Sequence, residues 1–210
     1  MIPIAGKPFL EHQITVLHQQ SIQDIILCVG HLSEQIQNYF GDGEQFNVHL
    51  QYSHDGDTLL GPIGALKHAE PLLNDVFFIM YGDSYLSVDF QHVYSTFLQH
   101  DKPALMVVYK NKDKYDKSNL VVEENLIVQY GNEQKTQKMM YIDYGTSILR
   151  KETLETIPRD TFYSTGMFFS DLIKKRQLLA FEAKKRFYHI GTQEALEELR
   201  EYLNFPTTPP

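Results

Sequence analysis

The chain has 210 residues, 42% of them hydrophobic, and its formal net charge is −8 at pH 7. A chain this acidic lacks the broad basic face that nucleic acids and anionic membranes require, so neither is an expected partner. No segment contains the roughly 18 consecutive apolar residues of a membrane span. We expect a single cytoplasmic domain over residues 1–204, followed by a disordered tail at 205–210.

The only cysteine, Cys28, lies inside the apolar run 25–29. One cysteine cannot form an internal disulfide, which favours a reducing compartment. Because its neighbours are apolar, we expect Cys28 to be buried as a small hydrophobic residue.

The first half of the chain alternates predicted helices and strands. A helix begins near Pro8, with Phe9, Ile14 and Leu17 on one face. The elements expected after it are strand 25–29, helix 32–41, strand 47–55, helix 64–73, strand 75–83 and helix 89–101. Since most of these strands are continuous apolar runs separated by helices, the pattern predicts an α/β fold with a sheet covered on both faces.

The second half is richer in strands. Strands are expected within 104–113, 118–133 and 139–150, and the segment 123–127 favours a hairpin turn. A helix followed by a strand is expected within 161–183, and a final helix within 186–204.

The strand at 75–83 ends in Tyr81-Gly82-Asp83-Ser84. Ligands of α/β sheets lie beyond the carboxyl ends of strands, so Asp83 stands where chemistry is expected. The alternative is that Asp83 only caps a helix or a turn.

Five motifs follow one another along residues 1–200: MIPIAGKPFLEHQI, DTLLGPIGALKHA, FFIMYGDSYLSVDF, MMYIDYGTSIL and RFYHIGTQEALEEL. In this order they resemble the sugar-1-phosphate nucleotidyltransferase family, in particular its heptose-1-phosphate and mannose-1-phosphate guanylyltransferases. This resemblance implies a Rossmann-like mixed sheet of the nucleotide-diphospho-sugar transferase type.

The implied reaction is attack of a sugar-1-phosphate on the α-phosphorus of a nucleoside triphosphate, with GTP favoured. The products would be pyrophosphate and a nucleotide-sugar, a precursor of surface polysaccharide or other glycans. Mg²⁺ is the implied cofactor, and Asp83 would be its carboxylate ligand and a catalytic residue. Gly82 would let the nucleotide approach the backbone closely.

The resemblance also implies a nucleotide-binding loop that contains Leu60, Gly61 and Gly64. Pro62 and Ile63 replace the Thr-Gly pair of the family there, and a plain turn between a strand and a helix is the alternative.

Asp143 and Gly145 would line the sugar pocket, although Asp143 could instead be a turn residue at a strand end. Lys7 could approach phosphate as a catalytic residue, or equally be a solvated lysine at a helix start.

Three departures from the family pattern stand out. The chain begins after the family's first strand and its Gly-x-Gly-Thr-Arg phosphate loop, and without that strand we expect open strand edges and exposed apolar surface. Asn132 replaces a lysine that is frequent in the family. His189 replaces the second metal carboxylate; it could complete a metal site with Asp83 that suits softer ions, or be a polar turn residue.

Two explanations are open: a late start in the given sequence would account for the first departure, and a non-catalytic paralogue that binds a nucleotide-sugar or regulates a partner would account for the other two. We expect this 210-residue polypeptide to be at most weakly active. The final helix and any open sheet edge offer surfaces for a homo-oligomer. An unrelated dehydrogenase or hydrolase is disfavoured, because neither Gly-x-Gly-x-x-Gly after the first strand nor Gly-x-Ser-x-Gly occurs.

Overall fold

The computed structural model describes residues 1–56, 59–131 and 136–204, so the expected tail at 205–210 and Asn132 lie outside the described residues. The helices are α1 (Phe9–Gln19), α2 (Ser33–Phe40), α3 (Gly61–His68), α4 (Phe90–Leu98), α5 (Thr165–Lys174) and α6 (Gln193–Asn204). The strands are β1 (Pro3–Ile4), β2 (Lys7–Pro8), β3 (Asp24–Val29), β4 (His49–His54), β5 (Val76–Met80), β6 (Ser84–Tyr85), β7 (Ala104–Tyr109), β8 (Leu120–Glu123), β9 (Leu126–Tyr130), β10 (Ile142–Arg150), β11 (Leu178–Glu182) and β12 (Tyr188–His189).

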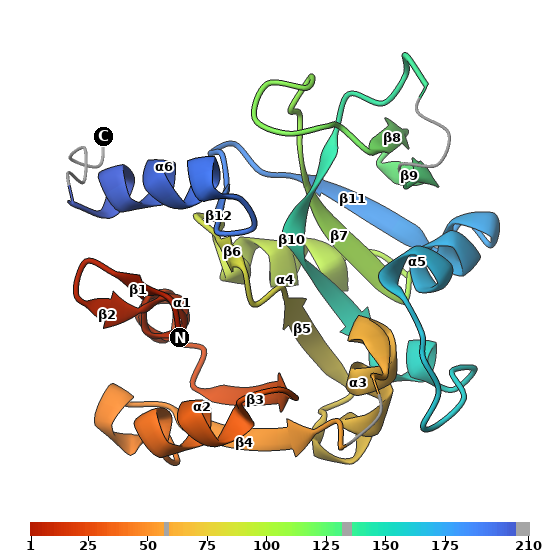
Figure 1. The fold of residues 1–210 in the computed structure, drawn as a ribbon. Coiled ribbons are helices and arrows are strands. Elements are labelled where there is room, and N and C mark those ends of the chain that lie inside the picture. Colours follow the sequence, from red (N-terminus) through yellow and green to blue (C-terminus); the bar gives the residue numbers. More distant parts are fainter. Residues whose placement is uncertain (57–58, 132–135, 205–210) are drawn as a thin grey trace.

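A six-stranded sheet with the order β5-β10-β7-β11-β9-β8 forms the centre of the molecule (Figure 1). β7 and β11 run parallel, and the other neighbouring pairs in this sheet run antiparallel. The expected α/β class with a mixed sheet is therefore confirmed.

Both faces of this sheet are covered, as the apolar strands predicted. On β7, Leu105 and Val107 pack in one core cluster with α4, whereas Met106 and Val108 pack in another with α3 and α5. Successive side chains of a strand point to opposite faces, so a fully buried strand needs apolar residues at every position. This packing makes the sheet a rigid platform for the loops at its ends.

β3 and β4 form a separate parallel pair. Within the described residues, β3 has a strand neighbour on the β4 side alone, and β5 has one on the β10 side alone. The expected open strand edges are thus present.

The expectation that Cys28 is buried is wrong, because this residue of β3 is exposed at such an edge. Its Sγ still lies 3.9 Å from the carbonyl oxygen of Ala65 in α3.

Most predicted elements appear within a few residues of their expected bounds. The predicted hairpin turn forms at Glu124 and Asn125, which both adopt positive φ between β8 and β9. The helix expected from Gly64 begins earlier, at Gly61, because Pro62 is well placed in a first helical turn, where a missing N–H costs nothing. Within the part of the chain that the structure describes, no helix has the length and apolar character needed to cross a bilayer.

Candidate active site

Asp83 lies just beyond the end of β5, as predicted from the sequence, and the residue is exposed to solvent. Its Oδ1 accepts a hydrogen bond from the Ser84 hydroxyl at 3.1 Å. Gly82 beside it is also exposed, and a Cβ added there would meet no atom within 4 Å. The carboxylate therefore faces open space, which fits a group that meets a ligand.

The backbone around Asp83 is held on three sides. The amide of Tyr81 donates to the Gly145 carbonyl of β10 at 2.9 Å, and the amide of Ile190 donates to the Asp83 carbonyl at 3.0 Å. From α1, the side-chain amide of Gln13 donates to the carbonyls of Tyr81 at 3.0 Å and Ser84 at 2.8 Å. An exposed carboxylate on so constrained a backbone is well prepared to receive a cation.

His189 lies next to this carboxylate because β12 pairs antiparallel with β6, with His189 opposite Ser84. A Cβ built on Gly191 would lie 3.2 Å from His189 Nδ1 and 3.8 Å from Asp83 Oδ2, so both atoms flank the same glycine. The Gly191 amide donates to His189 Nδ1 at 3.2 Å. A neutral ring in this geometry carries its proton on Nε2.

Within the described residues, no three His, Cys, Asp or Glu side chains gather as a metal site. Asp83 and His189 supply one carboxylate and one imidazole. A divalent cation here would need its other ligands from water and from substrate phosphates, which is how Mg²⁺ is commonly bound beside nucleotides. Asp83 and His189 are the side chains that would hold such an ion, and the ion would supply charge neutralisation for the phosphates.

Asp143 lies at the start of β10 within a polar cluster. Its Oδ2 accepts hydrogen bonds from the hydroxyls of Tyr81 at 2.9 Å and Tyr130 at 3.5 Å, and its Oδ1 accepts from the Gly145 amide at 2.9 Å. Its own amide donates to Asn119 Oδ1 at 3.2 Å. Burial raises the pKa of the Asp143 carboxyl to about 6, against the opposing effect of these donors.

Gly145 joins the Asp143 cluster to the Asp83 segment. Its φ is +96°, and a Cβ there would lie 2.7 Å from the Ser84 hydroxyl oxygen. Only glycine permits both this backbone conformation and this approach. The two regions that the sequence assigned to metal and sugar are therefore in direct contact.

The predicted nucleotide loop has contacts within the protein that account for its glycines. Cβ atoms at Gly61 and Gly64 would lie 2.9 and 2.5 Å from the carbonyl oxygens of Tyr163 and Thr161. The amides of Ile63 and Gly64 both donate to the Tyr163 carbonyl, and Leu60 is buried. Close packing against residues 161–163 thus explains these positions structurally, and their contact with a nucleotide stays a prediction.

Lys7 lies in β2, and its Nζ is 2.8 Å from Glu11 Oε1. Glu11 also accepts a hydrogen bond from the Tyr39 hydroxyl at 2.8 Å. In this arrangement the ammonium of Lys7 belongs to an ion pair at the start of α1, and its role toward phosphate stays a prediction.

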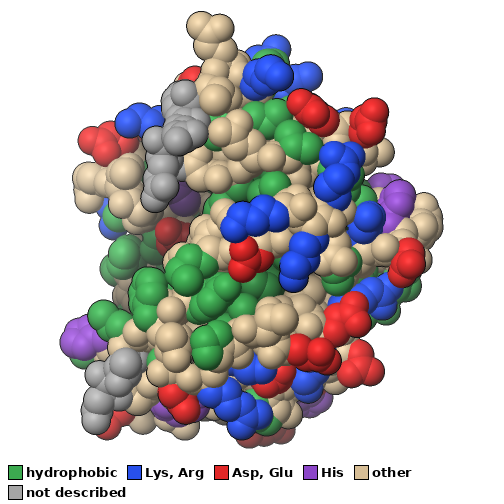
Figure 2. Space-filling model, turned by 90° about the vertical axis from the view of Figure 1, so that its right-hand side faces the viewer, with side chains coloured by type: hydrophobic (Ala, Val, Ile, Leu, Met, Phe, Trp, Pro, Cys, Tyr) green, Lys and Arg blue, Asp and Glu red, His purple; other side chains and the backbone are tan. Residues whose placement is uncertain are grey.

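Two surface clefts lie near, but not at, Asp83. A cleft of about 640 Å³ is lined by residues of α1 and of the segment after Asp83, including Tyr85 and Ser87. Another, of about 690 Å³, lies between β9 and α5 and includes Tyr130 of the Asp143 cluster. Figure 2 shows the side of the molecule that carries α5, where hydrophobic side chains gather; Phe162 and Met167 there are exposed.

Sequence reasoning missed three polar residues of the site, Gln13, Tyr130 and Asn119. For Gln13 a signal was available: it is four residues after Phe9 and four before Leu17, on the apolar face of α1, and it is buried. A polar residue on a buried face needs partners, which here are the carbonyls beside Asp83. Asn119 and Tyr130 carry no comparable local signal.

The order of these elements and their contacts correspond to a known family. A model of the nucleotidyl transferase family matches residues 1–201. The chain belongs to this family. The resemblance to sugar-1-phosphate nucleotidyltransferases, which are enzymes, is thereby confirmed.

Individual relatives of this nucleotidyl transferase differ in length. The chain is 27% identical over 184 residues to the UTP–glucose-1-phosphate uridylyltransferase of Synechocystis sp., covering 79% of this chain and 47% of that protein. It is 28% identical over 195 residues to the D-glycero-alpha-D-manno-heptose 1-phosphate guanylyltransferase of Campylobacter jejuni, covering 92% of this chain and 85% of that protein. The chain thus spans about half the length of the first relative and most of the second.

Solved structures share the fold of the chain. The crystal structure of HddC from Yersinia pseudotuberculosis complexed with GMP-PN superimposes with a TM-score of 0.80 at 25% identity, covering 97% of this chain and 88% of that one. The expected sheet of the nucleotide-diphospho-sugar transferase type is therefore confirmed.

Proposed function

We propose that the chain transfers a guanylyl group from GTP to a sugar-1-phosphate, releasing pyrophosphate and giving a nucleotide-sugar for polysaccharide or glycan synthesis. The observation that carries the proposal is the Asp83 carboxylate, exposed at the end of β5 on a backbone held by Gln13, Gly145 and Ile190. The guanine preference is supported by the guanylyltransferase among the relatives and by the nucleotide named with HddC.

In this mechanism Asp83 would hold Mg²⁺, with His189 as a second ligand. When bound, the ion would neutralise negative charge on the polyphosphate. Asp83 and the exposed Gly82 leave room for phosphates at the strand end, and the hydroxyls of Tyr81 and Tyr130 hold the Asp143 carboxylate that we propose for the sugar half. The protein's own contribution is positioning, because phosphoryl transfer needs alignment and charge neutralisation more than covalent chemistry.

Pyrophosphate release in the presence of GTP, Mg²⁺ and single sugar-1-phosphates tests the proposal. We expect slow release that depends on one of the sugar-1-phosphates, slow because an imidazole replaces a carboxylate at His189. Asp83→Asn should reduce the rate at least about tenfold, because it removes the charge that holds the ion. Asp75→Asn is the matched control, since Asp75 is an exposed carboxylate at the opposite end of β5.

Pyrophosphate release that persists unchanged in Asp83→Asn would contradict the assigned role of this carboxylate. Release with UTP or dTTP in place of GTP would correct the base but not the reaction. The alternative of a non-catalytic paralogue is not favoured by the relatives, which are named as transferases. It would be supported by nucleotide-sugar binding without any release of pyrophosphate.

A further inference from the structure

The side chain of Arg186 lies outside the predicted site and is held unusually tightly for a surface arginine. Its guanidinium carbon is 3.7 Å from the ring centre of Tyr115 and 4.3 Å from that of Tyr188. Nη2 lies 2.7 Å from Glu198 Oε2, and Nε donates to the Phe187 carbonyl at 3.2 Å. The side chain is only 24% exposed. A planar guanidinium can stack on rings through its faces and still bond in its plane, which an ammonium cannot do.

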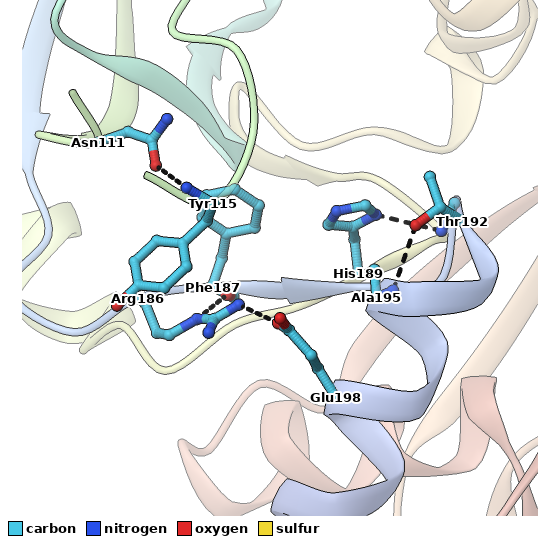
Figure 3. A network of polar contacts seen from close by, with 9 residues as sticks. Asn111, Tyr115, Arg186, Phe187, His189, Thr192, Ala195 and Glu198 are labelled. Carbon is cyan, nitrogen blue, oxygen red and sulfur yellow. Dashed lines mark hydrogen bonds and ion pairs between the residues drawn. The ribbon is translucent and has the colours of Figure 1, made fainter. Parts of the chain in front are cut away.

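The partners of Arg186 come from three segments that meet only in the folded chain (Figure 3). Tyr115 belongs to the loop that follows β7, Tyr188 to β12, and Glu198 to α6. The guanidinium therefore links a loop, a strand and a helix.

The loop that presents Tyr115 is braced internally. Asn111 is buried; its Oδ1 accepts from the Tyr115 amide at 3.1 Å and its Nδ2 donates to the Asp116 carbonyl at 2.6 Å. The Ser118 amide donates to Asp113 Oδ1 at 2.7 Å. Because these bonds fix the loop from end to end, a constraint on Tyr115 also constrains the residue that follows the loop.

Two of these segments, β12 and the loop, each lead directly to one half of the candidate site. Tyr188 precedes His189, which flanks Gly191 together with Asp83. The braced loop ends just before Asn119, whose Oδ1 accepts the amide of Asp143. Arg186 therefore lies between the Asp83–His189 half and the Asn119–Asp143 half.

We propose that Arg186 is a positioning residue that sets the placement of these two halves relative to each other, without touching a ligand. The inference rests on the proposed function, in which one half holds the metal and triphosphate and the other the sugar. Each substrate would still bind its own half of the site when the contacts of Arg186 are weakened. The alignment of the two substrates would suffer, and misplacement of about 1 Å can cost on the order of 100-fold in rate.

The test is Arg186→Lys, which keeps the positive charge and the reach to Glu198 but loses the planar stack. We expect kcat to fall at least about tenfold while KM for each substrate stays within about threefold. Arg200→Lys is the matched control, because Arg200 forms an ion pair of 2.7 Å with Glu197 on the same helix. The control should keep kcat within about twofold. Rates are compared below the unfolding temperature of every variant, so that lost stability alone does not lower kcat.

Two further measurements keep the proposal testable whatever happens to activity or folding. In a histidine-ring NMR spectrum, the His189 signal, assigned with His189→Gln, should shift in Arg186→Lys and not in Arg200→Lys. This NMR measurement does not depend on activity, so it tests the proposal even if the wild type transfers no nucleotide. An inactive wild type would refute only the proposed function. Tyr115→Leu removes the ring on the loop side alone and should lower kcat in the same direction. An unchanged kcat in folded Arg186→Lys and Tyr115→Leu, or an unmoved His189 signal, overturns the proposal.

Discussion

The carboxyl of Asp143 offers a quantitative test of the structure. Burial raises its pKa from an ordinary value of 3.8 to about 6. The folded chain thus binds this proton more tightly than the unfolded chain does. This tighter proton binding stabilises the folded state fully below about pH 4, and the stabilisation is lost as the pH rises through about 6. A rise of this size corresponds to about 3 kcal/mol of unfolding free energy in total, of which about 1 kcal/mol falls between pH 5 and pH 8.

Asp143→Asn removes the titration while keeping the shape and the bonding capacity of the side chain. The hydroxyls of Tyr81 and Tyr130 can turn to accept from the new amide, and Gly145 keeps its acceptor. We expect the free energy of unfolding of the variant, relative to the wild type, to rise by about 1 kcal/mol from pH 5 to pH 8.

Urea unfolding followed by circular dichroism at pH 5, 6, 7 and 8 measures this difference directly. Asp75→Asn serves as the control against which the slope is compared, because Asp75 is an exposed residue at the other end of β5 and lies outside the Asp143 cluster. A flat difference for Asp143→Asn would refute the reasoning that burial of this carboxyl outweighs its three hydrogen-bond donors.

Three further changes probe the positions that hold the site. Gly145→Ala should lower the free energy of unfolding by about 2–4 kcal/mol in urea titrations, because φ is +96° and the new Cβ would lie 2.7 Å from Ser84 Oγ. Gln13→Leu should cost about 2 kcal/mol by the same measurement, because the carbonyls of Tyr81 and Ser84 lose their donor. Although the residue is exposed, desolvation around its sulfur raises the pKa of the Cys28 thiol to about 11, so iodoacetamide at pH 8 should modify it at least about tenfold more slowly than an ordinary thiol, and a rate equal to that of free cysteine would contradict this pKa.

Local pattern was sufficient for the elements and for the position of Asp83. The apolar run before Tyr81-Gly82-Asp83 forms β5, and Asp83 is exposed at its end as expected. These features depend on neighbours in sequence, which set backbone preference and the alternation of buried side chains. The mistaken burial of Cys28 shows the limit of such reasoning, because an apolar run does not reveal whether a strand has a neighbour on both sides.

The sequence by itself determined the α/β class, the order of the elements and the placement of Asp83, since these follow from interactions over a few residues. Only the tertiary structure decided what surrounds that carboxylate. The bond from Tyr81 to Asp143 spans 62 positions and that from Gln13 to Ser84 spans 71, and Arg186 links Tyr115 in the loop after β7 to Glu198 in α6. Contacts of this kind leave no periodic trace along the chain, because either partner alone is an ordinary polar residue until folding brings the two together.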